Sequence, residues 1–125
     1  MVSPLAIAVA TIVGVVISGT YYAVVTLPEP ADGVRQPPTA AVQGAVELGR
    51  SAATALLVAW LAGEAGRASL VDGAVLGAAL WVLPVVLLVG SVVHEGTPVR
   101  AAVVHAGDWL LKLVAVGAVV ASLAR

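Results

Sequence analysis

Two apolar segments of the sequence carry polar and ionisable side chains at helical spacing. The first segment contains Gln43, Glu47, Arg50 and Thr54, and the second contains His105, Asp108 and Lys112. Steps of three and four residues place each set on one face of an α-helix. A buried acid, a base and a histidine are the groups that proton-linked transport uses. Each charge costs about 2.5–3.5 kcal/mol at the centre of a bilayer, so these side chains should face protein, water or one another.

The composition requires a membrane as the solvent of these segments. Of 125 residues, 61% are hydrophobic and 10% are charged, against about 25% charged residues in soluble domains. A soluble fold of this length leaves too much surface exposed to hide so many apolar side chains. The net charge of -1 gives no case for a nucleic acid as partner, and the absence of cysteine excludes disulfides and thiolate catalysis. The abundance of Ala, Val and Gly without Phe indicates a GC-rich genome, so we expect a bacterial cytoplasmic membrane protein.

Four stretches are long and apolar enough to cross a bilayer, which takes about 20 residues. They cover residues 4–27, 39–62, 70–93 and 98–123. Proline ends the first, Thr39 is a suitable N-cap for the second, and Pro84 should kink the third. Short connections predict antiparallel neighbours. The sequence therefore predicts an all-α membrane protein, with residues 1–125 as a single domain folded as an up-down bundle of four transmembrane helices. The first run has no Lys or Arg before it and is too long for a cleaved signal, so we expect it to be retained.

The two polar helices begin on the same side of the membrane, here named side B, opposite the termini on side A. At about 1.5 Å per residue, Glu47 lies roughly 12 Å deep, His105 roughly 10 Å and Asp108 roughly 15 Å, whereas Lys112 lies roughly 21 Å deep. The first helix brings Tyr21 and Tyr22 to a similar level. The sequence thus predicts a protonatable pocket open to side B, formed by Glu47, Arg50, His105, Asp108, Lys112 and Tyr21.

The same residues also fit a purely structural interpretation. Glu47 with Arg50, and Asp108 with Lys112, have the spacing of ion pairs that only fix helix packing. His105 would then be a neutral hydrogen-bonding residue, and Tyr22 is better interpreted as a residue of the interfacial aromatic belt. The two functional hypotheses are accordingly a small carrier or channel-like protein and a structural or accessory membrane subunit. An intramembrane enzyme is the weakest, since no nucleophile–base pair can be read, and neither a cofactor nor a metal is predicted.

Two further motifs carry less information. The segment His94–Pro98 begins like a zinc-protease motif but has Pro98 where the second histidine belongs. Gly73 and Gly77 form a small-residue contact motif. The expected partners are the lipid bilayer and a second copy of the chain, which would form a homo-oligomer through this face. Packing inside one chain explains the motif equally well.

Orientation in the membrane is left open by the charges. Arg67 and Arg125 flank side A, and Arg35 and Arg100 flank side B. The positive-inside rule compares the number of Lys and Arg residues on the two sides, and here the two numbers are equal.

Three segments resemble a bacterial family of four-helix membrane proteins, domain of unknown function 1761. They are residues 17–22 in the first helix, 73–81 at the start of the third, and 94–98 together with 106–110 around the start of the fourth. The resemblance implies a four-helix membrane fold and no established activity. Asp108 stands where the family usually has an aromatic residue, and His105 where it often has Asn or Asp. The second group of ionisable residues is therefore expected to be particular to this chain.

Overall fold

The computed structural model describes residues 3–27 and 38–124, and all of its regular structure is helical. The helices are α1 (Pro4–Val24), α2 (Ala40–Glu64), α3 (Leu70–Leu80), α4 (Val82–Glu95) and α5 (Val99–Ser122). The stretches Pro4–Val24, Ala40–Glu64, Leu70–Glu95 and Val99–Ser122 are each long and apolar enough to cross a membrane. The predicted all-α bundle with four membrane-crossing helices is confirmed. Residues 28–37, which hold Arg35, lie outside the described residues, as does Arg125.

The ends of the helices follow local capping chemistry. The Ser3 and Thr39 hydroxyls accept hydrogen bonds from the backbone N–H groups of Ala6 and Val42, so Thr39 is the N-cap that the sequence predicts. Gly96 ends α4 at φ +70°, a left-handed conformation that favours glycine. The first helix ends at Val24 rather than at Leu27, because the chain turns to extended geometry at Val25.

The third crossing helix is broken into α3 and α4 at Trp81. Pro84 has no backbone N–H and its ring crowds the carbonyl of Leu80, so the regular ladder is interrupted there. Bonds from Trp81 N–H to Gly77 O and from Val85 N–H to Trp81 O bridge the interruption, at 3.2 Å each. The Trp81 indole N–H donates to the carbonyl of Ala106 in α5 at 2.7 Å. The predicted kink is thus present and is tied to α5.

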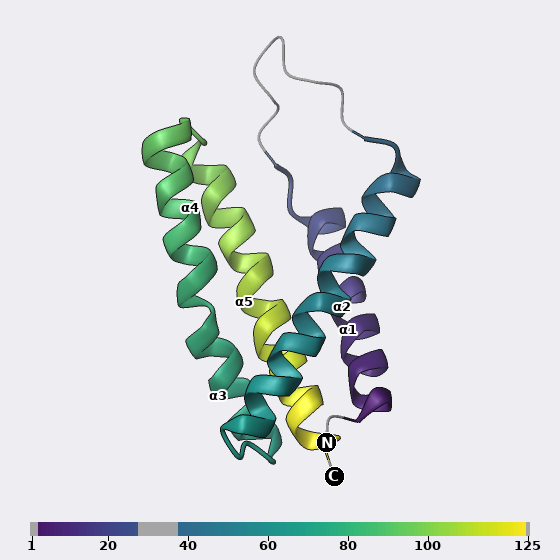
Figure 1. Ribbon diagram of the computed structural model, residues 1–125. Coiled ribbons are helices and arrows are strands. Elements are labelled where there is room, and N and C mark those ends of the chain that lie inside the picture. Colours follow the sequence, from purple (N-terminus) through teal and green to yellow (C-terminus); the bar gives the residue numbers. More distant parts are fainter. Residues whose placement is uncertain (1–2, 28–37, 125) are drawn as a thin grey trace.

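α5 is the central helix, and it contacts each of the other four. α1 contacts α2 and α5, whereas α4 contacts only α3 and α5 among the described residues (Figure 1). The start of α1, the end of α5 and the α2–α3 connection lie at one end of the molecule, and the α4–α5 turn lies at the other. The first end corresponds to side A and the second to side B.

The side-A half is held by small and branched apolar residues. Its core consists of Ala10 from α1, Ala55, Val58, Ala59 and Ala62 from α2, and Leu113, Val116 and Val120 from α5. α3 crosses α5 at backbone contact. A methyl group on Gly73 would overlap the Gly117 carbonyl, and one on Gly77 would overlap the Leu113 carbonyl. The Gly73/Gly77 face is therefore covered by α5 of the same chain, and a second copy would have to use another surface.

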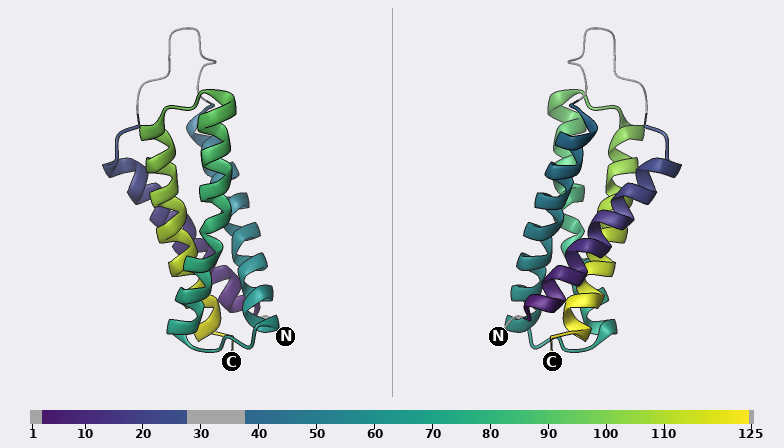
Figure 2. Two further views of the ribbon diagram at one scale, coloured as in Figure 1. Left: turned by 90° about the vertical axis from the view of Figure 1, so that its left-hand side faces the viewer. Right: turned by 90° about the vertical axis from the view of Figure 1, so that its right-hand side faces the viewer.

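α1 and α2 form a wedge that opens toward side B. They are in close contact at Gly14, where a Cβ would lie 3.1 Å from the Ser51 hydroxyl. From there α1 leans away from α2 toward the side-B end, which Figure 2 shows from two directions. This divergence leaves room between the two helices in the half of the molecule where the polar residues lie.

Candidate functional site

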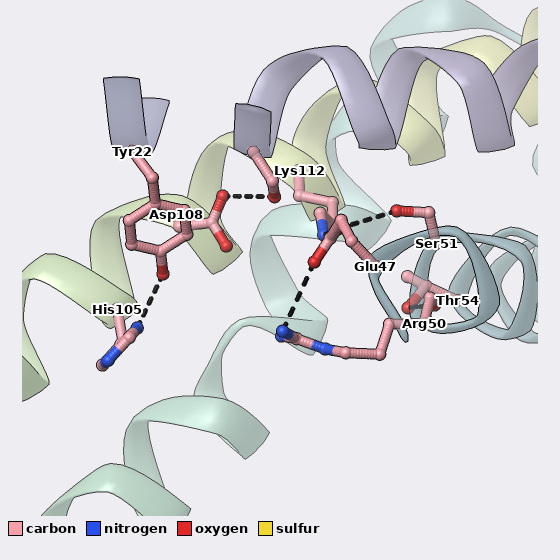
Figure 3. Close-up of polar contacts among 9 residues, drawn as sticks. Tyr22, Glu47, Arg50, Ser51, Thr54, His105, Asp108 and Lys112 are labelled. Atoms are coloured by element: carbon pink, nitrogen blue, oxygen red, sulfur yellow. Dashed lines mark hydrogen bonds and ion pairs between the residues drawn. The ribbon is translucent and has the colours of Figure 1, made fainter. Parts of the chain in front are cut away.

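The polar side chains of α1, α2 and α5 meet in the side-B half of the molecule (Figure 3). We call them the polar cluster. Its members are Ser18 and Tyr22 from α1, Glu47, Arg50 and Ser51 from α2, and His105, Asp108 and Lys112 from α5. The one-face spacing on α2 and α5 brings Glu47 and Lys112 into contact across the two helices.

Glu47 is the most connected acid of the cluster. Its Oε1 accepts hydrogen bonds from the Lys112 ammonium group and from the Ser51 hydroxyl, the latter at 2.9 Å. Its Oε2 forms an ion pair with Arg50 Nη1 at 3.4 Å. Lys112 and Ser51 are both fully buried. Both carboxylate oxygens of Glu47 are therefore engaged, and the Glu47–Arg50 pair suggested by their spacing is present.

Lys112 does not pair with Asp108, so that suggested pair is wrong. One turn of helix separates the two residues on α5, but Lys112 extends to Glu47 instead. The depth estimates placed Lys112 well below Glu47. They did not include the tilt of α2 against α5 or the length of the lysine side chain, which points back toward the start of its helix.

Asp108 is fully buried and has one hydrogen-bond partner. Its Oδ1 accepts from the Ser18 hydroxyl at 2.6 Å, and Ser18 is only 2% exposed. Its Oδ2 is buried and has no hydrogen-bond partner within residues 3–27 and 38–124. Buried polar atoms in proteins are nearly always paired, so the unpaired oxygen of Asp108 needs an explanation.

Both tyrosines of α1 form hydrogen bonds to α5. The Tyr21 hydroxyl donates to the backbone carbonyl of Val104 at 2.7 Å and fits against Gly107, which links α1 to α5. The Tyr22 hydroxyl shares a hydrogen bond of 2.6 Å with His105 Nδ1. Tyr22, interpreted from the sequence as a belt residue, thus joins the polar cluster. Adjacent residues on a helix differ by about 100° in direction, and the sequence alone does not fix the rotation of α1.

Trp109 lies close to both cations of the cluster. The Arg50 guanidinium carbon is 5.1 Å from the centre of its ring, and Lys112 Nζ is 5.5 Å from it. Both distances fall within the range of cation–π attraction. The indole ring therefore stabilises the positive charge of both side chains.

A cavity of about 790 Å³ occupies the wedge between α1 and α2 and reaches α5. We call it the side-B cavity. Its walls are Val15, Ser18, Gly19, Tyr22, Ala23, Val25, Thr26 and Leu27 from α1 and the residues after it, Pro38, Gln43, Gly44, Val46, Glu47 and Arg50 from the α2 side, and His105 from α5. Glu47, Arg50 and His105 of the predicted site line it. Tyr21, Asp108 and Lys112 do not, although Asp108 is linked to its wall through Ser18.

Sequence reasoning missed Ser18, Ser51 and Trp109. A usable signal existed for the two serines, because Ser18 lies one turn before Tyr22 and Ser51 one turn after Glu47. Serine is common in membrane helices as a packing residue, so its position alone does not single it out.

Comparison with known proteins gives one match. The family described as "Protein of unknown function (DUF1761)" matches residues 5–121, nearly the whole chain. The chain belongs to this family. The resemblance noted in the sequence is thereby confirmed. Neither the curated proteins nor the solved structures contain a significant match. The family carries no assigned activity, so the function has to be argued from the side-B cavity and the polar cluster.

Proposed function

We propose that this family member is a small carrier of the bacterial cytoplasmic membrane that binds its ligand in the side-B cavity. The observation that supports this most is a cavity of about 790 Å³ lined by Glu47, Arg50 and His105 in a chain with four membrane-crossing helices. Small-molecule sites typically have volumes of about 300–1,000 Å³, with a few polar groups on mostly apolar walls. The side-B cavity fits this description.

Asp108 is the proton-binding carboxyl in this proposal. Both oxygens of Glu47 are held by cations or by Ser51, whereas one oxygen of Asp108 has no partner in the part of the chain that the structure describes. Asp108 can take up a proton at Oδ2 without breaking an existing contact. The Ser18 hydroxyl connects it to the cavity wall, and His105 is the second titratable group there. Proton uptake near the ligand would couple ligand binding to pH.

A structural or accessory subunit is the second candidate. The observation that favours it is the saturation of Glu47, which contacts Lys112, Arg50 and Ser51 together. A carboxylate that is neutralised in this way needs no role other than to fix how α2 packs on α5. This candidate accounts for Glu47 and Lys112, but it gives no reason for the unpaired oxygen of Asp108 or for the cavity.

Flux in proteoliposomes separates the two candidates. The purified chain would be reconstituted with an internal pH dye, and proton movement would be followed after an imposed pH step. Wild type is expected to conduct or exchange protons, and Asp108→Asn to lose this activity while remaining folded. Asp72→Asn is the matched control, because Asp72 is exposed near side A and pairs with Arg67. Equal flux for wild type, Asp108→Asn and empty liposomes would refute the carrier.

A further inference from the structure

We propose that the ligand of the side-B cavity is an amphipathic anion, with one oxyanion group bound at Arg50 and an apolar body along the helix walls. This inference rests on the proposed function, because it names the ligand class of the same cavity. It follows from the ion pairs of the cluster, from the donors that face the cavity and from the composition of the walls.

The ion pairs of the cluster leave one cation without a carboxylate of its own. Two cations, Arg50 and Lys112, share the single carboxylate of Glu47. Asp108 forms no ion pair with either of them in the described part of the chain. Lys112 is fully buried and lies closest to Glu47, whereas the Arg50 side chain is 44% exposed and lines the cavity. Arg50 is therefore the cation that faces the cavity and can pair with a ligand.

The donors at the wall suit an oxyanion. A guanidinium group has five N–H donors in a planar fork that matches a carboxylate or phosphate, and the contact with Glu47 uses a donor on Nη1 alone. Figure 3 shows the Arg50 side chain extended from α2 toward Glu47. The Nδ1 atom of His105 is paired with Tyr22, so Nε2 is the imidazole nitrogen left for a ligand. No carboxylate on the wall other than that of Glu47 competes for these donors among the lining residues.

Apart from Ser18, Tyr22, Thr26 and Gln43, the remaining wall is apolar. Val15, Ala23, Val25 and Leu27 line the α1 side, and Val46 lines the α2 side. An oxyanion alone would fill a small fraction of about 790 Å³, so the rest of the ligand has to be apolar to gain from contact with these walls. A ligand of this class can come from water as a free organic acid, or from the bilayer as an anionic lipid headgroup with its chain.

Binding to the full chain in phosphatidylcholine nanodiscs tests the charge requirement. The probes are hexanoate, hexylamine and hexanol, which share an apolar chain and differ in the charge of the headgroup. Titration calorimetry against empty nanodiscs is expected to show saturable binding of hexanoate alone. Arg50→Gln should weaken hexanoate binding about 10- to 100-fold, as expected for the loss of a charge-assisted hydrogen bond. This variant keeps the Glu47–Lys112 pair and should fold. Arg100→Gln, on the side-B surface at the start of α5, is the matched control and should bind like wild type.

A lipid source is tested in the same system. Native mass spectrometry after exchange into mixed phosphatidylglycerol and phosphatidylcholine nanodiscs would show whether wild type, but not Arg50→Gln, retains phosphatidylglycerol. Retention, or hexanoate binding that depends on Arg50, supports an oxyanion ligand and identifies its source. Preferred binding of hexylamine overturns the anion class while the carrier stands. Hexanoate binding that is unchanged in Arg50→Gln also overturns it. Absence of binding by all probes, together with absence of proton flux, overturns both proposals.

Discussion

The ammonium group of Lys112 in α5 is fully buried and contacts the carboxylate of Glu47 in α2. Arg50, although it is closer to Glu47 in sequence, is the outer and more exposed partner. The pair joins two helices, whereas the Glu47–Arg50 contact stays within one. Removal of Lys112 should therefore destabilise the fold much more than removal of Arg50.

Lys112→Met should destabilise the fold by about 3 kcal/mol, the low end for breaking a buried pair, because Arg50 and Ser51 still contact Glu47. Arg50→Gln should cost no more than about 1 kcal/mol, because the exposed guanidinium contributes little. Unfolding in mixed detergent micelles, followed by circular dichroism, measures both, with the exposed Arg67→Gln as control. Equal losses for Lys112→Met and Arg50→Gln would contradict the assigned order of partners.

The energetic coupling between side chains should follow the same order. Glu47→Gln combined with Lys112→Met should cost clearly less than the sum of the two single changes, because the double variant leaves no charge unpaired. The cycle of Glu47→Gln with Arg50→Gln should give a smaller coupling. Additivity in the Glu47–Lys112 cycle would show that the two groups do not interact in the membrane.

The α3–α5 crossing gives a test that does not involve charge. Gly73→Ala would force its methyl group into the backbone of Gly117 and should destabilise the fold by about 1–3 kcal/mol, as overpacking does. Gly90→Ala in α4 is the matched control, because nothing lies within 4 Å of the added carbon. The same unfolding assay applies. A harmless Gly73→Ala change would mean that α3 and α5 are farther apart than described.

Removal of the Tyr22 hydroxyl should affect His105, whereas removal of the Tyr21 hydroxyl should not. Tyr22→Phe removes the hydrogen bond to His105 Nδ1 and should shift the side-chain ¹⁵N resonances of that histidine, whereas Tyr21→Phe should leave them nearly unchanged. Selective ¹⁵N-histidine labelling makes this visible, since the only other histidine is His94. Identical spectra for wild type and Tyr22→Phe would remove Tyr22 from the polar cluster.

Topology can be tested with single cysteines, since the chain has none of its own. Ser3→Cys and Ala65→Cys should react with an impermeant maleimide from one side, and Thr97→Cys from the other. Labelling of Ser3→Cys and Thr97→Cys from the same side would contradict four crossings. Partial labelling of every site from both sides would reveal dual orientation.

The sequence predicted what depends on one helix at a time. Hydropathy predicted the four crossings, and Pro84 predicted the kink. The spacing of polar residues within each helix predicted the faces on which Glu47 and Lys112 lie. It did not predict which cation Glu47 chooses, because that depends on the rotation and tilt of α2 against α5. It did not predict the contact of Tyr22 with His105 either, because that contact depends on the rotation of α1. The central position of α5 depends in part on Gly117, because only a residue without a side chain lets the backbone of α3 come into contact there.

The central position of α5 also has a consequence for how the protein is made. Membrane chains emerge from the ribosome with the N-terminal end first, and α5 follows the other four helices in the sequence. Glu47 therefore enters the bilayer long before Lys112 has been synthesised. During that interval Arg50 and Ser51, on the same helix as Glu47, are the partners within reach. The ion pair within α2 can therefore neutralise Glu47 during insertion, before α5 supplies Lys112 and the rest of the packing.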